Sequence, residues 1–73
     1  TDYLGKEIAE KTQYAWDKQF NSKINVVFGS EWNAGNLSYH LKSRPVWHGF
    51  VDRDKLDQLK DYMCLDNVCV GSR

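Results

Sequence analysis

The strongest constraint on the fold is an alternation between two apolar periods along the chain. Residues 3–20 place mostly apolar side chains at every fourth position, which predicts an amphipathic helix, and these residues are Leu4, Ile8, Thr12, Trp16 and Phe20. Residues 24–28 then form a short β-branched run that ends at Gly29 and Ser30, which predicts a buried strand followed by a tight turn.

The rest of the chain repeats this order of helix and strand. It predicts a helix from Ser30 or Glu31 to about Leu41, a strand over residues 46–51, a helix that begins at Asp52–Asp54 and carries Leu56, Leu59 and Met63 on one face, and a strand over residues 68–70. Gly35 weakens the middle of the second helix by about 1 kcal/mol relative to alanine, so we expect another backbone to approach it closely.

The alternation predicts an α/β fold in the order αβαβαβ. Because helical crossovers join parallel strands, we expect a small three-stranded, mainly parallel sheet flanked by three helices. Residues 1–73 are too few for more than one core and form a single domain. Residues 71–73 are expected to fray at the C-terminal end.

Composition excludes two classes of function. Ten Lys and Arg residues balance ten Asp and Glu residues, so the broad positive field needed for non-specific nucleic-acid binding is missing. The apolar runs, such as Val26-Val27-Phe28, are far shorter than a membrane-spanning segment. We therefore expect no nucleic-acid partner and no membrane span in these residues.

Cys64 and Cys69 are the only cysteines, with four residues between them. They could bridge a tight turn as a disulfide, or remain two small buried thiols in a reducing compartment. Two cysteines without a histidine cluster are too few for a structural zinc site. Neither has a histidine nearby in sequence, which argues against a nucleophilic role.

The densest polar and aromatic segment is residues 31–40. Trp32, Asn36 and the pair Tyr39/His40 share one face of a helix, and an indole beside amides and hydroxyls is often used to bind sugars. The alternative is that the aromatic rings pack and Asn36 bonds to backbone. Gly29-Ser30 lacks a phosphate-binding glycine motif, and Glu31 would repel an anion there.

The remaining polar residues point to no catalytic centre. His40 and His48 lack the spacing of metal ligands. The aspartates after residue 51 stand where helix-capping acids belong. We predict no catalytic residue, no cofactor and no metal ion.

The string from Val27 to Tyr39, VFGSEWNAGNLSY, followed by Ser43-Arg44-Pro45, resembles a region of known enzymes. It is similar to the extramembrane C-terminal region of bacterial membrane glycosyltransferases of the GT-C superfamily, of the protein-mannosyltransferase and lipid A aminoarabinose-transferase type. There a strand ends in glycine and an acidic residue, followed by tryptophan, Ala-Gly-Asn, an aromatic residue and Arg-Pro. The resemblance covers about Tyr3 to Trp47.

This resemblance implies a soluble domain on the periplasmic face of the bacterial inner membrane, as part of a polytopic transferase. Such an enzyme moves a sugar from a polyprenyl-phosphate carrier to a lipid or polysaccharide acceptor, and its catalytic groups belong to the membrane portion. The domain itself is then non-catalytic, and its partners are the membrane-embedded portion and possible carrier-linked sugars or glycan acceptors. The matched positions, expected to shape a cavity or hold a loop, are Gly29, Glu31, Trp32, Asn36, Tyr39 and Arg44.

Two further points qualify the resemblance. A periplasmic address would favour a disulfide between Cys64 and Cys69. Ser30 stands where an acid is common, with Glu31 one place later. The alternative function is a small carbohydrate- or peptide-binding interaction module that uses the face of Trp32 and Tyr39.

Overall fold

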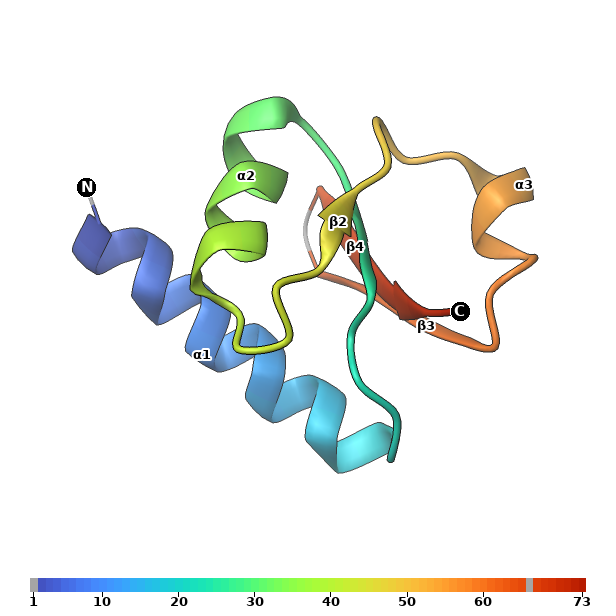
Figure 1. Cartoon of the computed structure of the whole chain (residues 1–73), viewed down its shortest axis with the longest axis horizontal. Coiled ribbons are helices and arrows are strands. Elements are labelled where there is room, and N and C mark those ends of the chain that lie inside the picture. The colour runs from blue at the N-terminus through green and yellow to red at the C-terminus, as the bar shows by residue number, and fades with distance from the viewer. Residues whose placement is uncertain (1, 66) are drawn as a thin grey trace.

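The computed structural model describes residues 2–65 and 67–73 as an α/β fold with one four-stranded sheet and three helices (Figure 1). The helices α1 and α2 lie on one face of the sheet, and the short helix α3 lies against the other. The elements are α1 (Asp2–Gln19), β1 (Val26–Phe28), α2 (Glu31–His40), β2 (Val46–Trp47), α3 (Arg53–Leu56), β3 (Asp61–Leu65) and β4 (Val68–Ser72).

The sheet is mixed, with strand order β2-β1-β4-β3. Strands β1 and β2 are parallel and are connected through α2, as the alternating pattern predicts. Strand β4 runs antiparallel to both β1 and β3. The α/β class is confirmed. The prediction of three mainly parallel strands is wrong, because residues 61–65 form a fourth strand and the predicted third strand, β4, runs antiparallel to both of its neighbours.

The predicted third helix accounts for this difference. Helix α3 is only four residues long and is capped by Asp52, whose side chain accepts a hydrogen bond from the backbone N–H of Asp54 (3.0 Å). Residues 61–65 pair with β4 instead, with Leu65 opposite Val68, so a very short turn is enough to join the two strands. Cross-strand pairing therefore overrides the helical spacing of Leu56, Leu59 and Met63.

The predicted strand over residues 46–51 is also shorter than expected. Only Val46 and Trp47 pair with β1, and Gly49 has a positive φ of 98° in the loop that follows. The predicted frayed end, in contrast, is ordered. Gly71 and Ser72 belong to β4, and the backbone N–H of Asn25 donates to the carbonyl of Gly71 (2.8 Å).

Alternation along β1 divides the core between the two faces of the sheet. Val27 packs in the cluster beneath α1 and α2, which also holds Trp16, Leu37 and Val70. On the opposite face lies a smaller cluster of Val26, Phe28, Leu56 and Cys69. A strand that is buried on both faces needs apolar side chains on both sides, which explains why residues 24–28 are all apolar except Asn25.

The buried face of α1 is narrower than its sequence pattern suggests. Ala9, Thr12 and Trp16 are buried, whereas Leu4 is 48% exposed and Ile8 is 39% exposed. Because an α-helix has 3.6 residues per turn, positions four apart drift around the axis by about 40° at each step. Five such positions thus spread over too wide an angle for all of them to face the core, and the N-terminal ones face solvent.

Of the glycines on the two long helices, Gly5 lies close to the other helix, whereas Gly35, where a close approach was predicted, does not. A Cβ atom on Gly5 would lie 2.7 Å from Oδ1 of Asn36 and 3.1 Å from Cδ2 of His40. Gly35 is exposed, and a Cβ atom there would meet no atom within 4 Å. Space is therefore tight at Gly5 on α1 and open at Gly35 on α2.

Replacing Gly35 by alanine is expected to stabilise the fold by about 1 kcal/mol, because alanine loses less backbone entropy in a helix. Urea denaturation followed by circular dichroism measures this change. The matched variant Gly5→Ala should stabilise the fold by less, since the side chain of Asn36 must move aside to admit its methyl group. A destabilising Gly35→Ala variant would contradict the open environment of that position.

Candidate functional site

The positions that match the glycosyltransferase pattern lie at the turn between β1 and α2 and at the far end of α2. Gly29 ends β1 with a φ of 148°, a conformation that favours glycine. Its N–H donates to the carbonyl of Gly49 (2.9 Å), and its carbonyl accepts from Nε1 of Trp47 (2.9 Å). A Cβ atom there would lie 3.1 Å from the carbonyl oxygen of Asn67. Gly29 thus lets the end of β1 fit between the β2 loop and the β3–β4 hairpin.

The start of α2 is capped locally. The side-chain oxygen of Ser30 accepts a hydrogen bond from the backbone N–H of Asn33 (3.3 Å). Glu31 is exposed in the first turn, where its negative charge suits the positive end of the helix dipole. These two residues therefore stabilise the helix start, and one of the N–H groups that an anion would need is already occupied.

The structure separates the other four matched residues into two pairs. Trp32 is 59% exposed, and the side-chain amide of Asn36 donates to its carbonyl oxygen (2.8 Å). Three residues after Asn36, Tyr39 is 63% exposed, and the guanidinium of Arg44 lies 5.2 Å from the centre of the Tyr39 ring. The first pair lines a cavity, whereas the second forms an exposed cation–π contact.

The cavity beside Trp32 has a volume of about 380 Å³ and lies between α1, α2 and the end of the β3–β4 hairpin. The residues that line it are Ile8, Lys11, Thr12, Ala15, Trp32, Asn33, Asn36, Leu37, Leu65, Asn67, Val68 and Val70. Sequence reasoning found two of them, because Trp32 and Asn36 are neighbours on one helix. It missed Lys11 and Asn67, which only tertiary packing brings to the same place.

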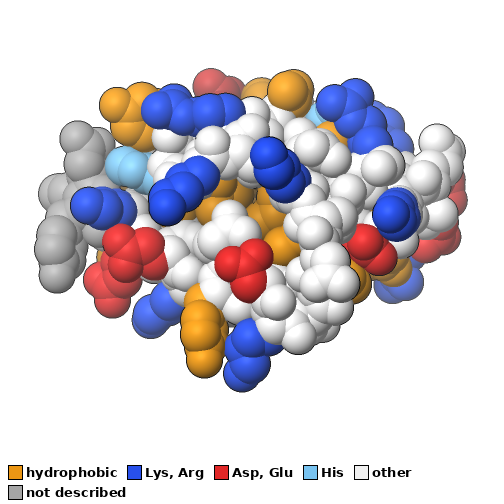
Figure 2. Space-filling model, turned by 60° about the horizontal axis from the view of Figure 1, so that its bottom comes forward, with side chains coloured by type: hydrophobic (Ala, Val, Ile, Leu, Met, Phe, Trp, Pro, Cys, Tyr) orange, Lys and Arg blue, Asp and Glu red, His pale blue; other side chains and the backbone are white. Residues whose placement is uncertain are grey.

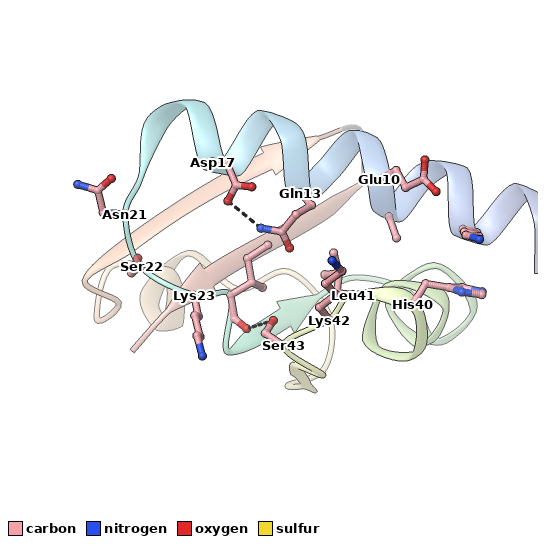
Figure 3. A pocket seen from close by; sticks show the side chains of 13 residues that line it. Glu10, Gln13, Asp17, Asn21, Ser22, Lys23, His40, Leu41, Lys42 and Ser43 are labelled. Carbon is pink, nitrogen blue, oxygen red and sulfur yellow. Dashed lines mark hydrogen bonds between the residues drawn. The ribbon is translucent and has the colours of Figure 1, made fainter.

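A second, more polar hollow of about 560 Å³ lies between α1 and the segment that leaves α2 (Figure 3). Several of its polar groups bond within the protein. Gln13 donates to Asp17 (2.9 Å), and the hydroxyl of Ser43 donates to the carbonyl of Ile24 (2.6 Å). Figure 2 shows Lys and Arg side chains interspersed with Asp and Glu around apolar patches. Because charges of both signs surround the hollow, it has no electrostatic preference for a ligand of one charge.

The two histidines lie apart and each contacts an aromatic ring. The His40 ring meets the edge of Tyr39 at 4.9 Å between centroids, and the His48 ring lies 5.9 Å from that of Phe28. Over residues 2–65 and 67–73, no three His, Cys, Asp or Glu side chains are grouped so that they could hold a metal ion.

Cys64 and Cys69 form a disulfide across the β3–β4 hairpin, where they stand directly opposite each other. The bond closes a short loop and ties an edge strand to the centre of the sheet. The sequence left free thiols and a disulfide open, and the structure has the disulfide.

Replacing both cysteines by alanine is expected to lower the free energy of unfolding by about 2 kcal/mol, as loop-closure entropy predicts for so short a loop. Urea denaturation of the oxidised protein and of the double variant measures the difference. A reductant should lower the stability of the unmodified chain and leave the double variant unchanged. Equal stability of both proteins without reductant would show that the bond contributes nothing to folding.

Comparison of the chain with sequence profiles of known protein families, with curated proteins and with solved structures gives no significant match. Among the helices of the described residues, none combines the length and the apolar character needed to cross a membrane.

Proposed function

We propose that this chain is an extramembrane, periplasmic domain of a polytopic glycosyltransferase that transfers a sugar from a polyprenyl-phosphate carrier to a lipid or polysaccharide acceptor. The domain itself does not carry out the transfer. The observation that supports this most is the role of the matched residues. Gly29 bonds to β2 and the loop after it, Asn36 bonds to the backbone of α2, and Arg44 makes a cation–π contact with Tyr39. The residues of the unusual sequence string thus hold this part of the fold together, which is the role the proposal gives them.

The disulfide supports the proposed compartment. Disulfides persist in oxidising environments such as the bacterial periplasm and are rare in the reducing cytosol. The pairing of Cys64 with Cys69 therefore fits a domain that folds on the periplasmic side of the inner membrane.

The segment at the β2 edge of the sheet is the surface at which we expect the membrane portion to dock. Val46 is 56% exposed, Phe50 is 71% exposed and Val51 is 49% exposed. The rings of Trp47 and Phe50 meet edge to face at 6.4 Å between centroids. Edge strands and contiguous exposed apolar side chains are typical of surfaces that another part of a protein covers.

The gene that encodes this chain provides the direct test. We expect its reading frame to contain several apolar segments of about 20 residues before the chain, each long enough to span a bilayer. The full-length protein should transfer sugar from a polyprenyl-phosphate donor, whereas the isolated 73-residue chain should fold and show no turnover. A reading frame without such segments, or turnover by the isolated chain on an activated sugar, would contradict the proposal.

Docking can be tested separately in the full-length protein. Phe50→Asp should make this domain more sensitive to protease in the membrane, because a charge at the contact weakens docking. Tyr14→Asp is the matched control, since Tyr14 is 67% exposed on α1, away from the β2 edge. Equal protease sensitivity of the two variants would place the contact elsewhere.

A further inference from the structure

Trp32 is the one tryptophan that the fold does not use. Trp16 is fully buried, and its Nε1 donates to the carbonyl of Ser22 (2.6 Å). Trp47 donates to Gly29, as described above. Trp32 leaves 59% of its surface exposed, and the described residues offer no hydrogen bond to its indole N–H. Its face and its donor are both available to a ligand.

The cavity beside this indole combines an apolar floor with a polar rim. Leu37 and Val70 are buried and form the floor with the partly buried Val68. Its volume of about 380 Å³ falls within the range of small-molecule sites. The cavity is therefore large enough for one compact ligand that has both apolar and polar surfaces.

The rim carries polar groups that the fold leaves available. The hydroxyl of Thr12 donates to the carbonyl of Ile8 (2.8 Å), and the amide nitrogen of Asn36 is likewise occupied. The side chains of Lys11, Asn33 and Asn67 make no hydrogen bond or ion pair to another described residue. Each amide can donate and accept at once, and the ammonium can donate three hydrogen bonds.

We propose that this cavity binds a pyranose ring of a glycan. The apolar C–H face of the sugar stacks on the indole of Trp32, because an aromatic ring offers a large flat apolar surface for contact. Its hydroxyl groups exchange hydrogen bonds with the amides of Asn33 and Asn67. Among the described residues that line the cavity, Lys11 is the only charged one, so a uronic acid binds more tightly than the neutral sugar of the same shape.

A sugar fits this site better than a peptide does. Extended peptides bind by adding a strand to a free sheet edge, and helical peptides need a long apolar groove. The cavity instead lies over a face of the sheet, bordered by α1, α2 and the β3–β4 hairpin. The inference goes beyond the proposed function and does not depend on it, although a glycan acceptor of a transferase would be a ligand of this class.

Nuclear magnetic resonance of the ¹⁵N-labelled chain tests the proposal, because its three indole N–H groups give separate signals. The probes are the methyl glycosides of glucose, mannose and N-acetylglucosamine, together with glucuronate. We expect saturable shifts of the Trp32 indole and of the backbone amides of Lys11, Asn33 and Asn67, with a Kd of about 1 mM. The indole signals of Trp16 and Trp47 should not move.

Three variants separate this site from other surfaces. Trp32→Ala should raise the Kd more than about 10-fold while the chain still unfolds cooperatively, since the indole is exposed. Tyr39→Ala is the matched aromatic control outside the cavity and should leave the Kd within about twofold. Lys11→Gln should abolish the preference for glucuronate over methyl glucoside.

The outcomes are distinct from those of the reading-frame test. No saturable shift with any of the sugars up to about 100 mM, or an equal loss of binding in Trp32→Ala and Tyr39→Ala, would overturn the sugar site. Saturable shifts of the same signals with a mixture of short peptides, and none with sugars, would assign the cavity to peptides and equally overturn it. Neither result bears on whether membrane-spanning segments precede the chain.

Discussion

Trp16→Ala is expected to lower the free energy of unfolding by about 4 kcal/mol, the largest effect of any single change considered for this fold. Trp16 has no exposed surface, packs against Phe20 with 4.4 Å between ring centroids and donates a hydrogen bond to Ser22. A domain of this length is held by about 4–11 kcal/mol. Loss of this side chain therefore removes much or all of its stability.

Urea denaturation monitored by far-ultraviolet circular dichroism measures the effect, with tryptophan fluorescence avoided because the variant removes a chromophore. Tyr14→Ala is the control on the same helix, since Tyr14 is 67% exposed. It should change stability by less than about 0.5 kcal/mol. A loss below about 2 kcal/mol for Trp16→Ala would show that the indole is not the centre of the core.

Gly71→Val should destabilise the fold by about 3 kcal/mol, because the site has no room for a side chain. A Cβ atom on Gly71 would lie 2.4 Å from Cδ1 of Leu59 and 2.9 Å from the carbonyl oxygen of Asp61. The end of Leu59 can rotate away, whereas Asp61 is part of β3 and is held by its pairing with Ser72. The backbone of the hairpin must therefore shift to accept any side chain here.

A graded pair of variants tests this contact. Gly71→Ala should already destabilise the fold, by less than Gly71→Val, because the first added carbon meets Asp61. Thermal unfolding of both variants beside Gly35→Ala compares a crowded glycine with an open one. A neutral Gly71→Ala would contradict the packing of β4 against β3.

The first half of the fold follows from signals that lie close together in the chain. The predicted helix at 3–20, strand at 24–28 and helix from Ser30 or Glu31 to Leu41 agree with α1, β1 and α2 to within about two residues. Ser30 does cap α2. Helical periodicity and capping depend on neighbours within four or five positions, so the chain carries them without reference to the rest of the fold.

The second half depends on partners that are distant or that compete. The spacing of Leu56, Leu59 and Met63 suits a helix, but Tyr62 to Leu65 can also pair with Val68 to Gly71, and that pairing prevails. Local propensity is weak enough for tertiary contacts to override it. The prediction of a close approach at Gly35 was wrong for the same reason, because the sequence of a helix does not say which segment packs against each of its faces.

For the candidate site, the chain alone places Trp32 and Asn36 together on α2, because residues four apart on a helix are neighbours. Packing supplies Lys11 from α1 and Asn67 from the hairpin, and with them a cavity. It also brings Cys64 opposite Cys69. The sequence by itself thus determines the helices and strands that depend on neighbouring residues. The cavity forms only when segments distant in the chain pack together, and the free energy of those long-range contacts is specified by the folded molecule alone.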